Sequence, residues 1–366
     1  MNYTFKVISL AVLISLMGIF TIYSIAINQE EGNLKTVFMR QITWVALGVL
    51  VFFFVAAYEY RRLWDVTYVL YAIMLLLLIL VLGLGHVRLG AQRWLKLFWL
   101  NFQPSEFAKL VTVIFLARYF SNKSVSDIRI PARSFGIFRG LVIPLVSVLI
   151  PMGLILEQPD LGTASMLFFV FIIMIYISDM RMSRIALLIF LVLLSLPVFW
   201  LFLRDYQRAR LMVFMNPNVD PLGAGYTIIQ SKIAIGSAGL VGKGWLFGTQ
   251  SQLLFLPESH TDFIFAAFAE EWGLLGCLVL LVLYYILISY SFRIALRTSD
   301  FFGRLLAAGI GSMFAVQIVI NIAMVMGLAP VVGLPLVLMS YGGSAVVVTF
   351  IALGILVNID RRRAVF

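Results

Sequence analysis

Residues 66–85, VTYVLYAIMLLLLILVLGLG, decide the fold class because they form an uncharged apolar run long enough to cross a bilayer. A transmembrane helix needs about 20 mostly apolar residues. Similar runs lie near 7–27, 37–57, 104–120, 139–156, 161–178, 185–203, 263–289, 305–328 and 343–359. Lipid offers backbone groups no hydrogen-bond partner, so these runs must be helices, and their Leu-rich blocks do not alternate as barrel strands would. The sequence therefore predicts an all-α polytopic membrane protein with about ten transmembrane helices.

The composition excludes other classes of protein. The chain is 62% apolar and only 12% charged, whereas a soluble protein is nearer a quarter charged. Its 31 Phe and 14 Tyr residues are too much apolar surface for a disordered chain. The single cysteine, Cys277, excludes an intramolecular disulfide, and two histidines leave no plausible zinc cluster. Membrane lipids are therefore an expected partner.

Basic residues indicate the orientation of the chain. Sixteen of the 27 Lys and Arg residues fall on the side that holds both termini, nine fall on the opposite side, and Arg40 and Lys109 lie inside predicted spans. The positive-inside rule places both termini in the cytoplasm. The net charge of +10 then lies on the cytoplasmic face, where it serves topology and contact with anionic lipids. It gives no indication of nucleic-acid binding.

Residues 205–262 form one long hydrophilic segment between the seventh and eighth predicted spans, on the outer side. The segment is rich in Gly, Asn and Pro, and its apolar stretches at 226–229 and 253–256 are too short to span a membrane. Long loops of this kind are usually functional or disordered. The aromatic and aliphatic content favours a folded extracytoplasmic lid that dips partly into the membrane.

Ionisable residues inside spans are costly and indicate function by default. The first such group is Gln103-Pro104-Ser105-Glu106-Phe107-Ala108-Lys109. Pro104 suits the first helical position, and Glu106 complements the positive end of the helix. Because Glu106 and Lys109 are three residues apart, they share a helix face. A buried ion pair that only fixes packing and a functional pair are both open.

Three further polar sites have competing explanations. Glu157-Gln158-Pro159-Asp160 places a carboxylate at the mouth of a helix, where capping is favoured over an internal repeat. Arg40 lies near the start of the second span, where extension to the interface is favoured over ligand contact. Glu270 and Glu271 are adjacent on a helix and point about 100° apart, so at most one faces a given cavity.

The stretch Leu256-Pro257-Glu258-Ser259-His260-Thr261-Asp262-Phe263-Ile264-Phe265 carries the clearest candidate for catalysis. Ser259, His260 and Asp262 are too close in sequence to converge as a Ser-His-Asp triad. Asp262 is instead a candidate general base or ligand of a hard divalent cation. The alternative is an N-cap by Asp262 or Thr261, worth about 1 kcal/mol of helix stability. Composition does not separate these two roles.

A last uncharged motif, Ser340-Tyr341-Gly342-Gly343-Ser344, lies at the outer end of the final span. Paired glycines permit close approach of the backbone to an anion or to a neighbouring helix. Small-residue helix packing is the favoured explanation for the motif alone.

Taken in order, these motifs resemble the SEDS family (shape, elongation, division and sporulation proteins), most closely its RodA branch. The resemblance covers most of the chain from about residue 85 onward. Besides the motifs above, it rests on Gly90–Leu95, Gln158–Thr163, Asp205–Arg208, Asp220–Tyr226, Gln230–Ser237, Gly242–Trp245 and Gly248–Gln252. It implies a single SEDS-type membrane domain over residues 1–366.

The resemblance implies a peptidoglycan glycosyltransferase for cell elongation and rod shape. Such an enzyme would polymerise lipid II, a disaccharide-pentapeptide on undecaprenyl pyrophosphate, at the outer face of the bacterial inner membrane. The family's essential carboxylate, in a His-Thr-Asp-Phe element, maps onto Asp262. A class B penicillin-binding protein would be the partner that supplies crosslinking.

The other candidate residues divide by expected role. The charge of the leaving pyrophosphate must be met by cations, and the candidates are Arg208, Arg210, Lys232 and Lys243, with Lys109 if Glu106 does not neutralise it. The sequence establishes no cofactor, and a divalent cation, Mg²⁺ or Mn²⁺, is a further candidate. Further substrate contacts are expected from Glu106, Asp160, His260, Ser340, Tyr341, Gly342 and Gly343. Structural or coupling roles are expected for Arg40, Gln103, Pro104, Ser105, Glu258 and Glu270.

Two other functions compete with polymerisation. Glu106, Lys109 and Asp160 fit a polar pathway through a lipid II flippase, although the polar residues gather at the outer mouth and not at the midplane. A non-catalytic scaffold for a penicillin-binding protein is the second alternative. Purified protein in detergent distinguishes an enzyme from a flippase, because polymerisation needs no second compartment.

Overall fold

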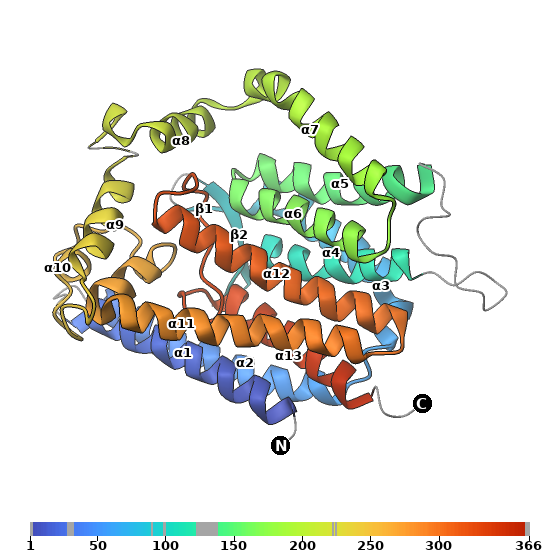
Figure 1. Ribbon diagram of the computed structural model, residues 1–366, viewed down its shortest axis with the longest axis horizontal. Coiled ribbons are helices and arrows are strands. Elements are labelled where there is room, and N and C mark those ends of the chain that lie inside the picture. The colour runs from blue at the N-terminus through green and yellow to red at the C-terminus, as the bar shows by residue number, and fades with distance from the viewer. Residues whose placement is uncertain are drawn as a thin grey trace. The chain divides into compact units, whose positions relative to one another are not determined.

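The computed structural model describes residues 3–27, 33–88, 91–97, 100–121, 138–221, 223 and 225–362. Part of the predicted cytoplasmic charge, at residues 122–137, lies outside them. The α-helices are α1 (Tyr3–Ile27), α2 (Asn33–Ala57), α3 (Arg62–Leu84), α4 (Pro104–Phe120), α5 (Ile143–Glu157), α6 (Leu161–Ile177), α7 (Met182–Phe202), α8 (Asp205–Met215), α9 (Tyr226–Ser237), α10 (Thr249–Gln252), α11 (Ile264–Arg297), α12 (Phe301–Val325) and α13 (Gly343–Arg362) (Figure 1). A π-helical turn, η2 (Phe138–Val142), precedes α5, and a 3₁₀ turn, η3 (Pro217–Val219), follows α8.

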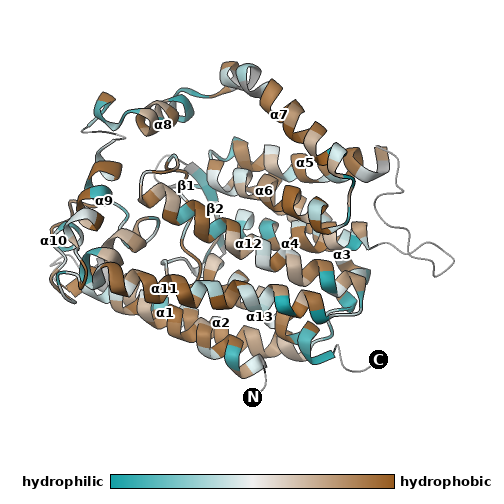
Figure 2. Cartoon of the chain, in the orientation of Figure 1, coloured by the Kyte–Doolittle hydropathy of each residue, from teal (hydrophilic) through white to brown (hydrophobic). Residues whose placement is uncertain are grey.

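The prediction of an all-α polytopic membrane protein is confirmed. Each of the ten predicted apolar runs coincides with a helix. Among the described residues, seven helices are long and apolar enough to cross a membrane, and α6 and the first part of α7 are shorter apolar segments. Figure 2 shows mainly hydrophobic residues along α7 and α11 and more hydrophilic residues in β1, β2 and around α8.

A small sheet, which the apolar runs did not predict, joins α3 to α4. Its strands are β1 (His86–Arg88), β2 (Ala91–Leu97) and β3 (Leu100–Phe102), antiparallel in the order β1-β2-β3. His86 pairs with Trp94, and Leu95 pairs with Phe102. The strand β2 packs against both α3 and α4, so the sheet covers the start of α4.

The chain forms two compact units, each assembled from distant segments. The second unit comprises residues 50–196, 288–316 and 350–366. Within it, α3, α4, α5 and α6 pack on one another. Helix α4 is buried along nearly its whole length, although its mean hydropathy is modest. A buried amide also joins its segments, because Asn358 accepts a hydrogen bond from the Tyr60 N–H at 3.0 Å and donates to the Ala56 carbonyl at 2.9 Å.

The first unit comprises residues 1–49, 197–287 and 317–349. It holds the whole predicted outer segment, 205–262, which is folded into α8, η3, α9 and α10. Gly18 of α1 lies against the Met339 backbone, where a Cβ atom would come within 2.2 Å of the carbonyl oxygen. Ser231 of α9 donates to the Val325 carbonyl at 2.6 Å. The outer segment is therefore packed on the end of α12 in the same unit.

Candidate active site

In the first unit, a tight turn over residues 258–262 precedes α11. Glu258 has a positive φ of 50°, and its carbonyl accepts hydrogen bonds from the N–H groups of Thr261 (3.1 Å) and Phe263 (3.3 Å). Its carboxylate also accepts a hydrogen bond from the Thr261 hydroxyl at 3.0 Å. Glu258 thus shapes the turn that carries Asp262.

Asp262 does not occupy the N-cap position. The Ala266 and Ala267 N–H groups donate to the Phe263 carbonyl, and α11 begins at Ile264, so Phe263 is the N-cap residue. The side chain of Asp262 is partly exposed, whereas residues 263–271 are buried. Asp262 thus precedes the N-cap position of α11 by one residue.

Three consecutive carbonyl groups of this turn are bound by groups from later in the chain. The His260 carbonyl accepts from the Tyr341 N–H at 2.9 Å, and the Thr261 carbonyl accepts from the Ser340 hydroxyl at 2.6 Å. The Asp262 carbonyl accepts from the Asn321 amide at 2.9 Å. The backbone on which Asp262 is carried is therefore held at three successive peptide groups.

The Ser340–Ser344 motif makes both hydrogen bonds and close packing contacts with other segments of the first unit. Ser340 is buried, and its own carbonyl accepts a hydrogen bond from the Gln41 side chain at 3.1 Å. A Cβ atom on Gly343 would lie 2.3 Å from the Trp44 ring, so this glycine allows α2 and α13 to approach. The Gly342 N–H donates to the Gln41 amide oxygen at 3.4 Å, and the Tyr341 ring lies 6.0 Å from that of His260.

The carboxylate of Glu270 is fully buried and binds the outer segment to α11. It lies 2.7 Å from the Lys243 ammonium, accepts from the Thr249 hydroxyl at 2.9 Å, and accepts from the Gln250 N–H at 3.0 Å. The charge of Lys243 is thereby matched by a carboxylate. Of the pair at 270 and 271, Glu270 faces this network, while Glu271 accepts from the Ser24 hydroxyl.

Helix α11 is interrupted at Gly273, and the outer segment supplies the missing backbone hydrogen bonds. The Lys243 and Gly244 N–H groups donate to the Glu270 and Glu271 carbonyls at 2.9 and 3.0 Å. In return, the Leu274 and Leu275 N–H groups donate to the Gly239 and Leu240 carbonyls, both at 3.1 Å. Unsatisfied backbone groups are not tolerated in lipid, so this exchange makes the break possible inside a span.

The other predicted cations of this unit have different surroundings. Arg208 donates to the Trp200 and Leu201 carbonyls at 3.3 and 3.0 Å. Arg210 donates to the Val331 carbonyl at 3.2 Å. Lys232 is exposed, and its side chain passes over Gly327, where an added Cβ would lie 2.2 Å from the Lys232 Cε. Arg40 of α2 is also exposed.

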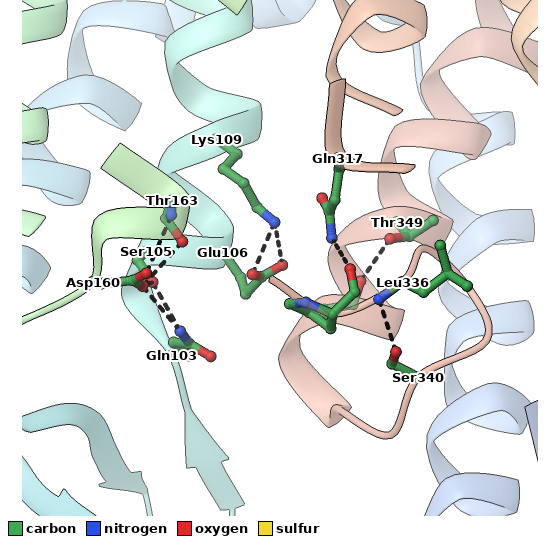
Figure 3. A network of polar contacts seen from close by, with 12 residues as sticks. Gln103, Ser105, Glu106, Lys109, Asp160, Thr163, Gln317, Leu336, Ser340 and Thr349 are labelled. Atoms are coloured by element: carbon green, nitrogen blue, oxygen red, sulfur yellow. Dashed lines mark hydrogen bonds and ion pairs between the residues drawn. The ribbon is translucent and has the colours of Figure 1, made fainter. Parts of the chain in front are cut away.

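In the second unit, Glu106 and Lys109 form a buried ion pair near the start of α4. Their Nζ and Oε2 atoms lie 2.8 Å apart, and the two side chains are 4% and 2% exposed. Pro104 lies in the first turn, as predicted, with Gln103 as the N-cap residue. Figure 3 shows the ammonium group directed at both carboxylate oxygens. The charges of Glu106 and Lys109 thus neutralise each other.

Asp160 caps the start of α6, as its sequence position predicts. It accepts hydrogen bonds from the Thr163 N–H (3.1 Å) and hydroxyl (3.0 Å), from the Ser105 hydroxyl (3.2 Å) and from the Gln103 amide (3.5 Å) (Figure 3). The residue is buried. This network, which includes Ser105 and Gln103, ties the starts of α4 and α6 together.

Three contributors were missed by sequence reasoning. Asn321 and Gln41 are polar residues inside apolar runs, which is the same indication that drew attention to Glu106. Arg93 donates to the Gln158 and Pro159 carbonyls, a contact that its motif could not reveal.

The described residues contain no group of three or more His, Cys, Asp or Glu side chains placed to hold a metal ion. Mg²⁺ commonly binds through one or two carboxylates together with substrate phosphates. The donor set near Asp262 would therefore need oxygens from a substrate to complete a cation site.

The chain matches a family model and named proteins over most of its length. The family model FTSW_RODA_SPOVE, described as "Cell cycle protein", matches residues 4–365. The chain is 42% identical to peptidoglycan glycosyltransferase MrdB of Escherichia coli K12, over 96% of this chain and 93% of the relative. It is 32% identical to peptidoglycan glycosyltransferase RodA of Treponema pallidum, over 95% of each chain.

Solved structures are also similar to the chain over nearly its whole length. A chain from the work titled "Structural coordination of polymerization and crosslinking by a peptidoglycan synthase complex" superposes with a TM-score of 0.81 at 32% identity, over 98% of both chains. The crystal structure of the rod shape determining protein RodA of Thermus thermophilus gives a TM-score of 0.70 at 29% identity, over 98% of this chain and 97% of that one.

Proposed function

The chain belongs to the FtsW/RodA/SpoVE family, and from this membership we propose that it is a peptidoglycan glycosyltransferase that polymerises lipid II. Relatives named for this activity align with nearly the whole chain. The observation that carries the assignment to a site is the turn at Asp262. Asp262 is partly exposed, it precedes the N-cap residue of α11, and the turn that carries it is held at three carbonyl groups.

We assign Asp262 the role of general base, by analogy with inverting glycosidases. Its carboxylate accepts the proton of the acceptor's sugar hydroxyl as that oxygen bonds to the anomeric carbon of the donor. The bond from this carbon to the pyrophosphate breaks, and undecaprenyl pyrophosphate leaves with the electron pair. One peptidoglycan disaccharide unit is thereby added to the glycan strand.

The candidate cations for neutralising the leaving pyrophosphate can be ranked by the groups that they already contact. Lys243 and Lys109 each lie 2.7–2.8 Å from a buried carboxylate, so neither offers a net positive charge. Lys232 is the first candidate, because it is exposed where it passes over Gly327. Arg208 and Arg210 bind main-chain carbonyls, and Arg208 also lies 3.9 Å from the Asp205 carboxylate. A divalent cation held by Asp262 together with substrate phosphates stays a prediction.

The cellular setting is also part of the proposal. The excess of Lys and Arg on the predicted cytoplasmic loops supports cytoplasmic termini and an active site at the outer face of the bacterial inner membrane. A class B penicillin-binding protein is the proposed partner, because the similar chain comes from a complex described as coordinating polymerisation and crosslinking.

Asp262→Asn tests the catalytic assignment directly. The amide has the same shape as the carboxylate but cannot accept the proton as a base. Purified protein in detergent, supplied with lipid II, is expected to lose glycan polymer on gels while it still binds lipid II. Polymer from the wild-type protein in this single compartment also excludes a flippase that has no polymerase activity.

Asp220→Asn is the matched control. Asp220 is an exposed carboxylate of the same outer segment, and it accepts a hydrogen bond from the Gly223 N–H that asparagine can also accept. This variant is expected to polymerise at the wild-type rate. Near-normal polymer from Asp262→Asn would reject the base assignment and favour a carrier or a scaffold.

A further inference from the structure

We propose that Asn321 and Ser340 are positioning residues that fix the carboxylate of Asp262 by binding the main-chain carbonyls beside it. The inference rests on the proposed function, because it assigns both side chains a part in the same reaction. Both side chains are buried, so this role replaces the substrate contact that the sequence led us to expect of Ser340. Each acts through the backbone of the 258–262 turn.

Each of the two side chains joins the turn to a second segment. Asn321 donates from one amide nitrogen to the Asp262 carbonyl at 2.9 Å and to the Leu334 carbonyl at 2.6 Å. Ser340 donates to the Thr261 carbonyl at 2.6 Å and accepts from the Leu336 N–H at 2.7 Å. The turn, α12 and the 334–340 segment are thereby held as one group.

Burial makes these bonds strong constraints. Asn321 and Ser340 are 0% and 3% exposed, and hydrogen bonds in low-dielectric surroundings are stronger than in water. The Asp262 and Thr261 carbonyls that they bind are partly buried, and loss of the donor to such a group costs up to about 1–3 kcal/mol. The turn is therefore expected to shift or to admit water when either donor is removed, and Asp262 would move with it.

The hydrogen bonds of Asn321 and Ser340 are not explained by support of the 334–340 segment alone, because other side chains also bind that segment. Gln317 lies one helical turn before Asn321 on α12 and donates to the Pro335 carbonyl at 2.8 Å. Tyr284 donates to the Val337 carbonyl at 2.7 Å. These two bonds hold the same segment at Pro335 and Val337. Gln317 is thus a natural control for a purely structural effect.

The test compares Asn321→Leu with Gln317→Leu in the detergent polymerisation assay. Each change replaces an amide side chain on α12 by leucine. We expect Asn321→Leu to lower kcat by about 10- to 100-fold with KM for lipid II within about twofold, because misplacement of a reacting group by about 1 Å acts on the chemical step. Gln317→Leu is expected to keep kcat within about threefold of wild type.

Ser340 supplies an independent pair of variants. Ser340→Ala removes the hydroxyl and is expected to lower kcat to a similar degree as Asn321→Leu. Ser340→Thr retains a hydroxyl and is expected to recover most of the rate. This pair keeps the inference testable if Asn321→Leu fails to fold, because Ser340→Ala removes only one buried oxygen atom.

Hydrogen–deuterium exchange gives a readout that does not depend on activity. The Tyr341 N–H donates to the His260 carbonyl, so peptides covering this amide are expected to exchange faster in Asn321→Leu and Ser340→Ala than in Gln317→Leu. Equal loss of kcat in the two leucine variants, full kcat in Asn321→Leu, or unchanged exchange would each overturn the positioning role. Polymer from Asp262→Asn would instead overturn the proposed function and leave the exchange result standing.

Discussion

At the scale of single residues, the buried pair of Glu106 and Lys109 poses a choice that the sequence left open between packing and chemistry. Removal of one partner from a buried ion pair leaves an uncompensated charge and typically costs about 3–5 kcal/mol. We therefore expect Lys109→Met to lower the free energy of unfolding by this amount. Denaturant titration of the purified protein in detergent, followed by Trp fluorescence, measures the change.

The double variant Glu106→Gln/Lys109→Met separates the two roles. Both charges are then absent, so most of the stability is expected to return. If polymerisation returns with it, the pair serves packing; if stability returns without activity, the charges serve the reaction. Glu59→Gln is the control, because the half-exposed pair of Glu59 with Arg362 (3.6 Å) is worth at most about 1 kcal/mol.

At the scale of an element, the break in α11 depends on glycine. Gly273 has φ 64° and ψ −165°, a region that is almost confined to glycine and costs other residues about 1–3 kcal/mol. A Cβ atom there would also lie 2.2 Å from the Gly242 nitrogen. Gly273→Ala is expected to lower the thermal unfolding temperature and to increase proteolysis of residues 239–252. The control Gly153→Ala has open space around the added methyl group and is expected to be neutral or slightly stabilising.

At the scale of the whole molecule, the predicted topology can be tested with single cysteines. Cys277 is buried, so a Cys277→Ala background offers no competing thiol. In spheroplasts, Asp220→Cys in the outer segment is expected to react with a membrane-impermeant maleimide. Arg181→Cys, between α6 and α7, is expected to react only after permeabilisation. The reverse labelling pattern would contradict the positive-inside assignment.

Helix positions were predictable because bilayer crossing is a local property of about 20 consecutive residues. The ends of the runs at 66–85 and 343–359 lie within four residues of the ends of α3 and α13. The sheet at 86–102 was not predicted, because its strands of three to seven residues carry little periodic pattern. The break at Gly273 was also missed, since an apolar run continues on both sides of it.

The candidate base illustrates what local chemistry can reveal and where it stops. Asp262 could be singled out because it lies in the His-Thr-Asp-Phe element that matches the family's essential carboxylate, whereas composition alone did not separate a helix cap from a base. The partners of the charged groups are another matter: Lys243 pairs with Glu270, 27 residues away, and Asn321 binds the Asp262 carbonyl across 59 residues. Spacing along one helix or turn carries no information about such pairs, because they form only when distant segments pack together. The length of the apolar runs therefore determined where the sequence predicts membrane-spanning helices. Which polar groups bind one another is determined only by the tertiary structure.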